Sequence, residues 1–181
     1  MHLPVVSLQC RKLSDALLDQ RGGSLLESER FLLNRQLRAQ GMDEIAVAQR
    51  VAVGHRLVFD SELYYCSRYK RVKSRNSYTV KYCDGSRDAY GQIQFFVSVQ
   101  NSWFAFILKL IPHSLSCKQH FQMAHNALDR ISVSKIVPVI TGNLTCVHVK
   151  LLVRKCVFIH INDSIGNCSY VVTFPNNLLT D

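Results

Sequence analysis

The chain has 181 residues, and its 22 Lys and Arg against 13 Asp and Glu give a formal net charge of +9. With 48% hydrophobic and 19% charged residues, it is too apolar to be a basic disordered tail. Its length suits one domain, or one domain with an appendage. A content of only 8 Gly and 4 Pro excludes collagen-like and low-complexity sequences.

The N-terminal third is predicted to be helical. Ser24 and Glu27 have the spacing of a capping box, and the leucines that follow keep a helical period until Gly41. A second short helix is predicted over residues 43–51, because acids occupy its first turn. The tract 9–19 is amphipathic as well. We therefore expect residues 1–55 to form a helical N-terminal segment.

From about Val51 the apolar period changes from 3.6 residues to 2, and the sequence becomes rich in Val, Ile, Tyr and Phe, which predicts β-strands. The Asp84-Gly85 pair predicts a hairpin that joins strand 77–83 to strand 89–96. Polar residues interrupt the apolar stretch 95–112, so we expect two core strands around a turn and no membrane span.

Short strands without helical crossovers indicate a mainly β fold. We expect a small antiparallel barrel over residues 56–181, with a loop and short helix inserted at about 113–129. Gly91 is expected to allow a bulge or bend in the strand 89–99. Trp103, the sole tryptophan, is expected to cap the core, and Cys156 is expected to be a buried thiol rather than a reactive one.

A cluster of cations and tyrosines is the most informative feature. Residues 67–88 contain seven cations and two acids, a net charge of +5, and six of the seven tyrosines lie between residues 64 and 90. Cations neutralise phosphates and aromatic rings stack on bases, so the cluster predicts a nucleic-acid or other polyanion surface. A basic edge strand that prevents aggregation would have the same composition. The candidate contact residues are Arg68, Tyr69, Lys70, Arg71, Lys73, Arg75, Tyr78 and Lys81.

A second cluster contains the donor types of a zinc site within 13 residues: His113, Cys117, His120 and His125. The spacing argues against a site, because on a helix His120 and His125 would point in different directions. The cluster also contains no CxxC or HxxxH pair. We expect a polar loop here, and no bound metal or cofactor.

The sequence offers no catalytic motif. It contains no glycine-rich phosphate loop, nucleophile-elbow serine or HExxH sequence, and only three acids follow residue 90. A Cys/His dyad, for example around Cys117, would have to be built by the fold. The odd number of seven cysteines and the lack of a signal-peptide pattern favour reduced thiols inside the cell. We expect a protein that is not an enzyme and has no small-molecule substrate.

Parts of the sequence resemble known families. Residues 147–159 (VHVKLLVRKCVFI) and 168–176 (CSYVVTFPN) resemble the closing strands of bromo-adjacent homology modules. Residues 69–80 (YKRVKSRNSYTV), with Asp84-Gly85 and residues 89–96 (AYGQIQFF), resemble the C-terminal region of uncharacterised transposable-element-derived proteins of invertebrate animals. The resemblance covers about residues 57–176 and implies an SH3-like barrel used as an interaction module. It does not extend to methyl-lysine recognition, because no aromatic cage can be placed on this sequence.

These patterns predict a non-catalytic binding module of transposon origin that docks on nucleic acid or chromatin. An intracellular location is expected, in the nucleus rather than the cytoplasm, with no membrane partner. One alternative is a protein–protein interaction module that selects acidic peptides. Another is a non-catalytic fragment of a larger transposase-like enzyme.

Overall fold

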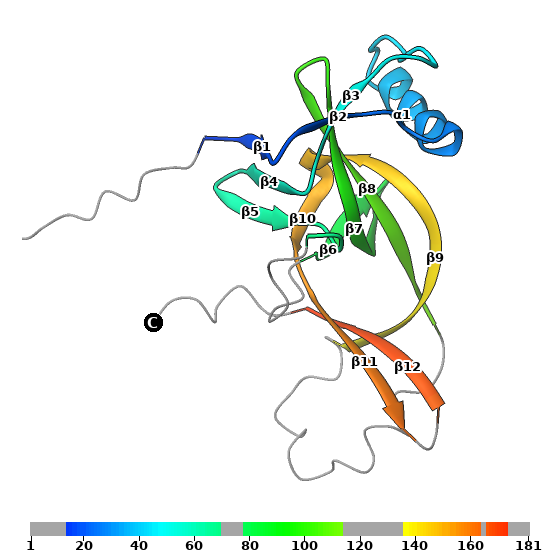
Figure 1. Cartoon of the computed structure of the whole chain (residues 1–181). Helices are drawn as coiled ribbons and strands as arrows, with labels where there is room; N and C mark the ends of the chain where they lie inside the picture. The colour runs from blue at the N-terminus through cyan, green and yellow to red at the C-terminus, as the bar shows by residue number, and fades with distance from the viewer. Residues whose placement is uncertain (1–13, 70–77, 114–135, 164–165, 174–181) are drawn as a thin grey trace, which may run out of the picture.

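The computed structural model describes residues 14–69, 78–113, 136–163 and 166–173. Within these residues the protein is mainly β, with antiparallel strand pairs and one α-helix (Figure 1). In chain order the elements are β1 (Ala16–Leu18), β2 (Arg21–Gly23), α1 (Glu27–Ala39), β3 (Val51–Gly54), β4 (Arg56–Phe59), β5 (Glu62–Tyr65), β6 (Thr79–Asp84), β7 (Arg87–Val99), β8 (Ser102–Pro112), β9 (Ile136–His148), a 3-10 helix (Val149–Leu151), β10 (Leu152–Lys155), β11 (Val157–Asp163) and β12 (Gly166–Val172).

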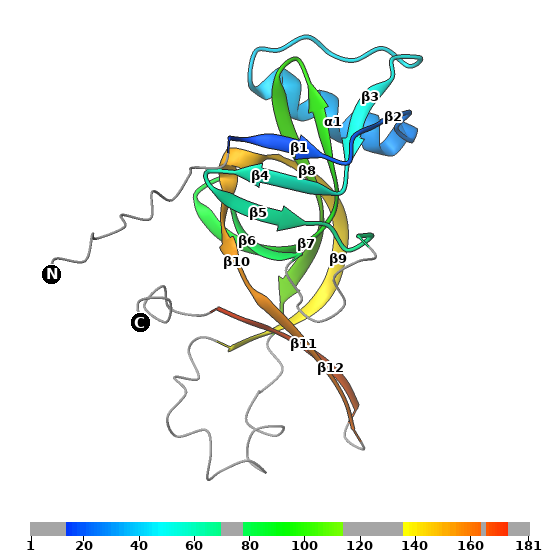
Figure 2. The same ribbon diagram turned by 60° about the vertical axis from the view of Figure 1, so that its left-hand side comes forward.

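The strands form two sheets. The larger has the strand order β10-β6-β7-β8-β9-β12-β11, with β3 also paired to β7 and β2 paired to β3. The smaller has the order β1-β4-β5. Among the described residues the large sheet does not close into a barrel, because no strand pairing joins its two end strands, β10 and β11. In the chain, however, only Cys156 separates these two strands. The large sheet therefore curves strongly, as Figures 1 and 2 show. The predicted mainly β, antiparallel class is confirmed, and no closed barrel is seen.

The large sheet has a hydrophobic core on each face. One core lies toward the small sheet and includes Leu57 of β4 and Ile93 and Phe96 of β7. The other lies under α1 and includes Leu33 and Leu37 of the helix with Phe95 and Val97 of β7. A register shift between Ile93 and Phe95 marks a β-bulge at Gln94. Because of this bulge, Ile93 and Phe96 lie on the same face although they are three positions apart in the chain.

The N-terminal third contains one helix and three short strands. Helix α1 begins at Glu27 with Leu26 as its N-cap, two residues after the predicted N-cap Ser24, and Glu29 rather than Glu27 accepts a hydrogen bond from the backbone N–H of the N-cap residue at 2.9 Å. The helix predicted over residues 43–51 is wrong. The backbone N–H and C=O of Ile45 bond to the buried side chain of Asn34, at 2.9 and 3.2 Å, and Val51 begins a strand. Burial against α1 thus overrides the local helical pattern.

Other parts of this third join strands from the rest of the chain. β1, which lies in the amphipathic tract predicted over 9–19, pairs with β4, and β3 pairs with β7. Residues 9–13 of that tract, and most of the insertion predicted at 113–129, lie outside the described residues.

Both turns that the sequence predicts are present. β6 and β7 pair antiparallel from Thr79↔Gln92 to Asp84↔Arg87, and Gly85 in the turn has a φ of +65°. The stretch 95–112 divides into the end of β7 and β8, joined by Gln100 and Asn101 with φ of +49° and +60°. Among the described residues no helix is long and apolar enough to cross a membrane.

Gly91 was expected to allow a bend in β7, but it lies in regular register, opposite Val80 and Lys109. A Cβ placed there would overlap the side chain of Ile107 and lie 2.9 Å from the carbonyl oxygen of Leu108. Its role is therefore to let β8 approach closely, and the bend is made by the bulge at Gln94.

We predict that Gly91→Ala lowers the free energy of unfolding by about 1–3 kcal/mol, because the core around Gly91 has no space for the added methyl group. Gly22→Ala is the matched control, since the nearest atom to its new Cβ is the mobile side chain of Arg50 at 3.8 Å. Urea unfolding of both variants measures the difference. Equal stability of the two variants would contradict the packing argument.

Candidate nucleic-acid interface

The predicted basic cluster is anchored on the bulged part of β7. The backbone N–H of Ser67 donates to the carbonyl oxygen of Ile93 at 2.7 Å, and the N–H of Ile93 donates to the carbonyl oxygen of Tyr78 at 2.9 Å. The Ser67 hydroxyl also bonds to the side-chain oxygen of Gln94 at 3.1 Å. The chain on both sides of residues 70–77 is thus fixed to a single residue of β7. We call residues 66–69, Tyr78 and residues 93–95 the loop root.

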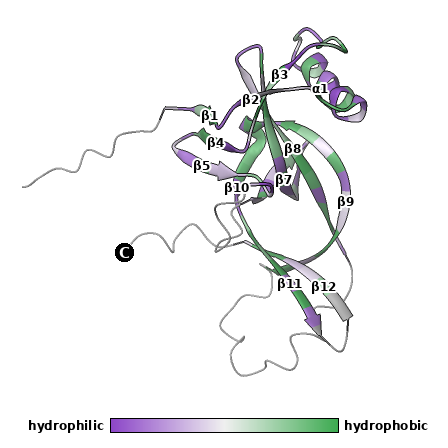
Figure 3. Ribbon diagram, viewed as in Figure 1, coloured by the Kyte–Doolittle hydropathy of each residue, from purple (hydrophilic) through white to green (hydrophobic). Residues whose placement is uncertain are grey.

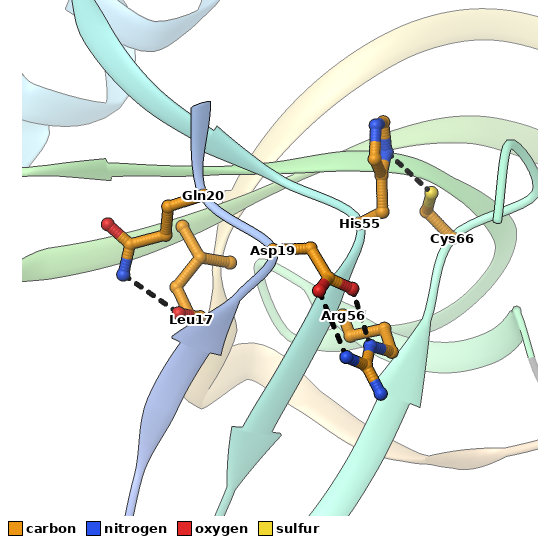
Figure 4. Close-up of polar contacts among 6 residues, drawn as sticks. All are labelled: Leu17, Asp19, Gln20, His55, Arg56 and Cys66. Carbon is orange, nitrogen blue, oxygen red and sulfur yellow. Dashed lines mark hydrogen bonds and ion pairs between the residues drawn. The ribbon is translucent and has the colours of Figure 1, made fainter. Parts of the chain in front are cut away.

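Cys66 holds one side of the loop root in place. Its backbone N–H donates to the carbonyl oxygen of His55 at 3.0 Å, and its Sγ lies 3.3 Å from Nδ1 of His55 (Figure 4). The side chain is 1% exposed. Burial raises the pKa of the Cys66 thiol, and hydrogen bonds from the backbone N–H groups of Arg68 and Tyr69 offset this only in part. This pair is therefore a structural contact, because a nucleophilic cysteine needs a lowered pKa and access to solvent.

Aromatic rings and guanidinium groups stack next to the loop root. Arg56 lies 5.1 Å from the ring centroid of Tyr69, and that ring lies 5.4 Å from the ring of Tyr65. The Arg68 guanidinium lies 5.6 Å from the ring centroid of Phe95. These distances are within the range of cation–π attraction. The stack fixes the directions of side chains at the start of the basic segment.

Arg56 is also held by a carboxylate. Its Nε and a terminal guanidinium nitrogen donate to the two oxygens of Asp19 at 2.7 and 3.0 Å, a bidentate pair that Figure 4 shows. The hydrogen bond to Asp19 raises the pKa of Arg56. The pair connects the end of β1 to β4, so its charge is already compensated within the protein.

Several other cations of the described residues are paired in the same way. Lys81 bonds to Asp88 at 2.6 Å and Lys109 to Asp84 at 2.8 Å, both at the β6–β7 hairpin. Lys155 lies 3.5 Å from Glu62, and Arg38 lies 2.8 Å from Glu44. Arg68 is exposed, and like the exposed Arg21 and Arg35 it forms no ion pair with any of the described carboxylates.

The positive charge is therefore unevenly divided. The described residues contain 13 Lys and Arg and 11 Asp and Glu, a net charge of +2. The remaining residues contain nine cations and two acids, a net charge of +7. Residues 70–77 alone contribute four cations and no acid. The described part of the chain is therefore nearly neutral, and the loop root flanks the segment in which cations are densest.

Of the eight predicted contact residues, four are described: Arg68, Tyr69, Tyr78 and Lys81. The first three lie together at the loop root, whereas Lys81 is paired with Asp88 and its side chain is only 17% exposed. Lys70, Arg71, Lys73 and Arg75 lie outside the described residues.

Of the candidate metal ligands only His113 is described, and Cys117, His120 and His125 lie outside that part of the chain. Within the described ranges no group of three or more His, Cys, Asp and Glu is placed to hold a metal ion.

The sequence analysis missed Arg56, Tyr65 and Phe95. Arg56 and Tyr65 are Cα partners on β4 and β5, and Phe95 comes from a strand 27 residues beyond Arg68. No local pattern signals these contacts, because pairing between distant strands creates them.

Two predicted roles are confirmed. Cys156 is buried and its pKa is raised to about 11 by burial, while Trp103 packs at the edge of the core against Phe59.

Comparison with known proteins gives no relative: no family model, no curated protein and no solved structure matches this chain.

We predict that Cys66→Ala lowers the free energy of unfolding by about 1–3 kcal/mol, because the N–H of Arg68 loses its buried sulfur acceptor and the N–H of Tyr69 keeps only the carbonyl oxygen of residue 66, at 3.1 Å. Amide hydrogen exchange at these two residues should accelerate more than exchange in the core of β7. Cys83→Ala, at a half-buried position of β6, is the control and should change the stability by less than about 0.5 kcal/mol. Unchanged exchange at Arg68 and Tyr69 would show that the thiol does not hold the loop root.

Proposed function

We propose that this protein is a non-catalytic binding module that docks on nucleic acid or chromatin through the loop root and the basic segment 70–77. Arg68 and the cations at positions 70, 71, 73 and 75 contact phosphates in this proposal. Tyr78 supplies an aromatic contact. Tyr69, which is engaged by Arg56 and Tyr65, mainly orients the start of the segment.

The division of charge is the observation that carries the proposal. If the basic residues served only to keep an edge strand soluble, the cations would be expected to spread over the sheet and to face solvent. Here many of the sheet's cations are paired with carboxylates, and the excess lies in a segment whose flanks are fixed to Ile93 by two hydrogen bonds. Because both flanks of the cationic segment are already fixed, less conformational entropy is lost when the segment binds a polyanion.

The proposal includes an SH3-like barrel of the bromo-adjacent homology type, a transposon origin and a nuclear location. Support for the barrel comes from the curvature of the large sheet, whose end strands β10 and β11 adjoin at Cys156. Of the residues that resemble the closing strands of that family, 147–159 run from the end of β9 through the 3-10 helix and β10 to the start of β11, and 168–172 lie in β12. The nuclear location and the origin rest on the resemblance alone.

The experiment is a fluorescence anisotropy titration of labelled single-stranded and duplex oligonucleotides over a range of salt concentrations. With about five phosphate contacts, log affinity for duplex DNA should fall against log salt with a slope of about −4 to −5. The double variant Arg71→Ala, Arg75→Ala should reduce the steepness of this slope by about 2, because each lost phosphate contact removes about 0.9.

The matched control is Arg21→Ala, Arg35→Ala, which removes the same charge from exposed positions on β2 and α1. It should leave the slope close to that of the unmodified protein. If binding shows no salt dependence, or if both double variants lose affinity equally, the proposed interface is wrong. Binding of an acidic peptide without binding of oligonucleotides would favour the protein–protein module instead.

A further inference from the structure

His148 is the residue at which β9 ends and the chain turns towards β10. It is the N-cap of the 3-10 helix Val149–Leu151, and its Nδ1 accepts a hydrogen bond from the backbone N–H of Lys150 at 3.1 Å. A ring nitrogen of histidine accepts a hydrogen bond only when it carries no proton. The imidazole that caps this turn is therefore neutral, with its proton on Nε2.

The turn that His148 caps connects two strands that are distant in the large sheet. β10 is at one end of the strand order β10-β6-β7-β8-β9, and β9 is at the other. Figures 1 and 2 show the chain passing from β9 to β10 at the end of the molecule that carries α1. Val149 in the turn is fully buried in the core that lies toward the small sheet. A loosened turn would therefore weaken the placement of β10 beside its partner β6.

The imidazole ring lies where a positive charge is poorly solvated. It is half-buried and packs edge-to-face against Phe104 of β8, with 5.3 Å between the ring centroids and 81° between the ring planes. Phe104 is fully buried, and Figure 3 shows most of β8 coloured as hydrophobic. Burial lowers the pKa of His148, and the nearby charge of Lys150 lowers it further. Both effects oppose a charge on the ring.

The charged groups around the ring do not compensate for a proton. Among the described residues, Lys150 is the charged group that acts on His148. β9 carries no charged side chain, and the one charge of β8, on Lys109, is held in an ion pair at the β6–β7 hairpin. The α1 cation Arg35 acts on Cys146, and burial raises the pKa of that thiol, which keeps it neutral. A protonated His148 would thus face a second cation and none of the described carboxylates.

We propose that His148 makes the connection between β9 and β10 sensitive to pH. At neutral pH the imidazole accepts the N–H of Lys150 and holds the turn closed. A proton taken from solvent onto Nδ1 removes this acceptor, and the imidazolium is solvated only if the ring leaves Phe104. The open turn takes up the proton more readily than the closed turn, so opening becomes more favourable as the pH falls below about 6.5, the ordinary value for imidazole. The inference does not require that the protein bind nucleic acid.

The test is amide hydrogen exchange followed by NMR at about pH 7.5 and about pH 5.5, on either side of the ordinary imidazole value. The protection factor of the Lys150 amide, which corrects for the intrinsic effect of pH on exchange, should fall about fivefold on acidification, because one hydrogen bond is lost. Amides in the middle of β8 should keep their protection.

The variant His148→Asn separates the cap from the proton. An Asn side-chain oxygen accepts a hydrogen bond from the backbone N–H two residues on, but it does not titrate. In this variant the protection of Lys150 should be the same at both pH values. His160→Asn is the matched control, because it removes an exposed histidine of β11 that bonds to Ser169 at 2.9 Å. The fall at Lys150 should persist in the control.

A second measurement uses the unmodified protein, so that a misfolded variant does not decide the outcome. The NMR signals of the His148 ring should titrate below about pH 6.5, and the shift of the Lys150 amide should follow the same midpoint. A ring that titrates at or above about 6.5 would overturn the proposal. So would Lys150 protection that does not depend on pH, or a fall in protection that a folded His148→Asn variant leaves unchanged.

Discussion

The bulge at Gln94 is the constraint on which the rest of this structure depends. In a regular strand alternate residues share a face, so a shift by one residue moves the following side chains to the other face. The bulge places Ile93 on the same face as Phe96, in the core under the small sheet, whereas Phe95, Val97 and Val99 face the core under α1. One strand thus supplies apolar side chains to both cores, and the sheet can be covered on both faces.

The same bulge positions the loop root. A classic bulge adds an unpaired residue to one strand and increases the local bend. Here the N–H of Ile93 donates to the carbonyl oxygen of Tyr78, the residue before β6, the C=O of Ile93 accepts from Ser67, and Gln94 bonds to Ser67 through its side chain. The feature that divides the two cores therefore also holds both flanks of the basic segment. A change that straightened β7 would disturb the packing and the candidate interface together.

The ion pairs of the sheet affect the external potential more than the stability. Exposed pairs of this kind contribute about 0–1 kcal/mol each. Each one nevertheless removes a cation from the field that a polyanion meets, and the described residues retain a net charge of only +2. The segments outside the described residues carry the remaining net charge of +7. These segments therefore attract a phosphate backbone more strongly than the described residues do.

Sequence reasoning predicted the local features well. The β6–β7 hairpin depends on an Asp-Gly turn, and the β7–β8 turn on a polar break in an apolar run, so both follow from neighbouring residues. It failed where distant residues decide. The tract 43–51 is not helical because Asn34 binds the backbone of Ile45, and Arg56 reaches the site because Asp19 and Tyr69 hold it. Neither contact leaves a trace in local periodicity. The bulge was expected near Gly91, since glycine marks bulges, but Gly91 instead makes room for Ile107.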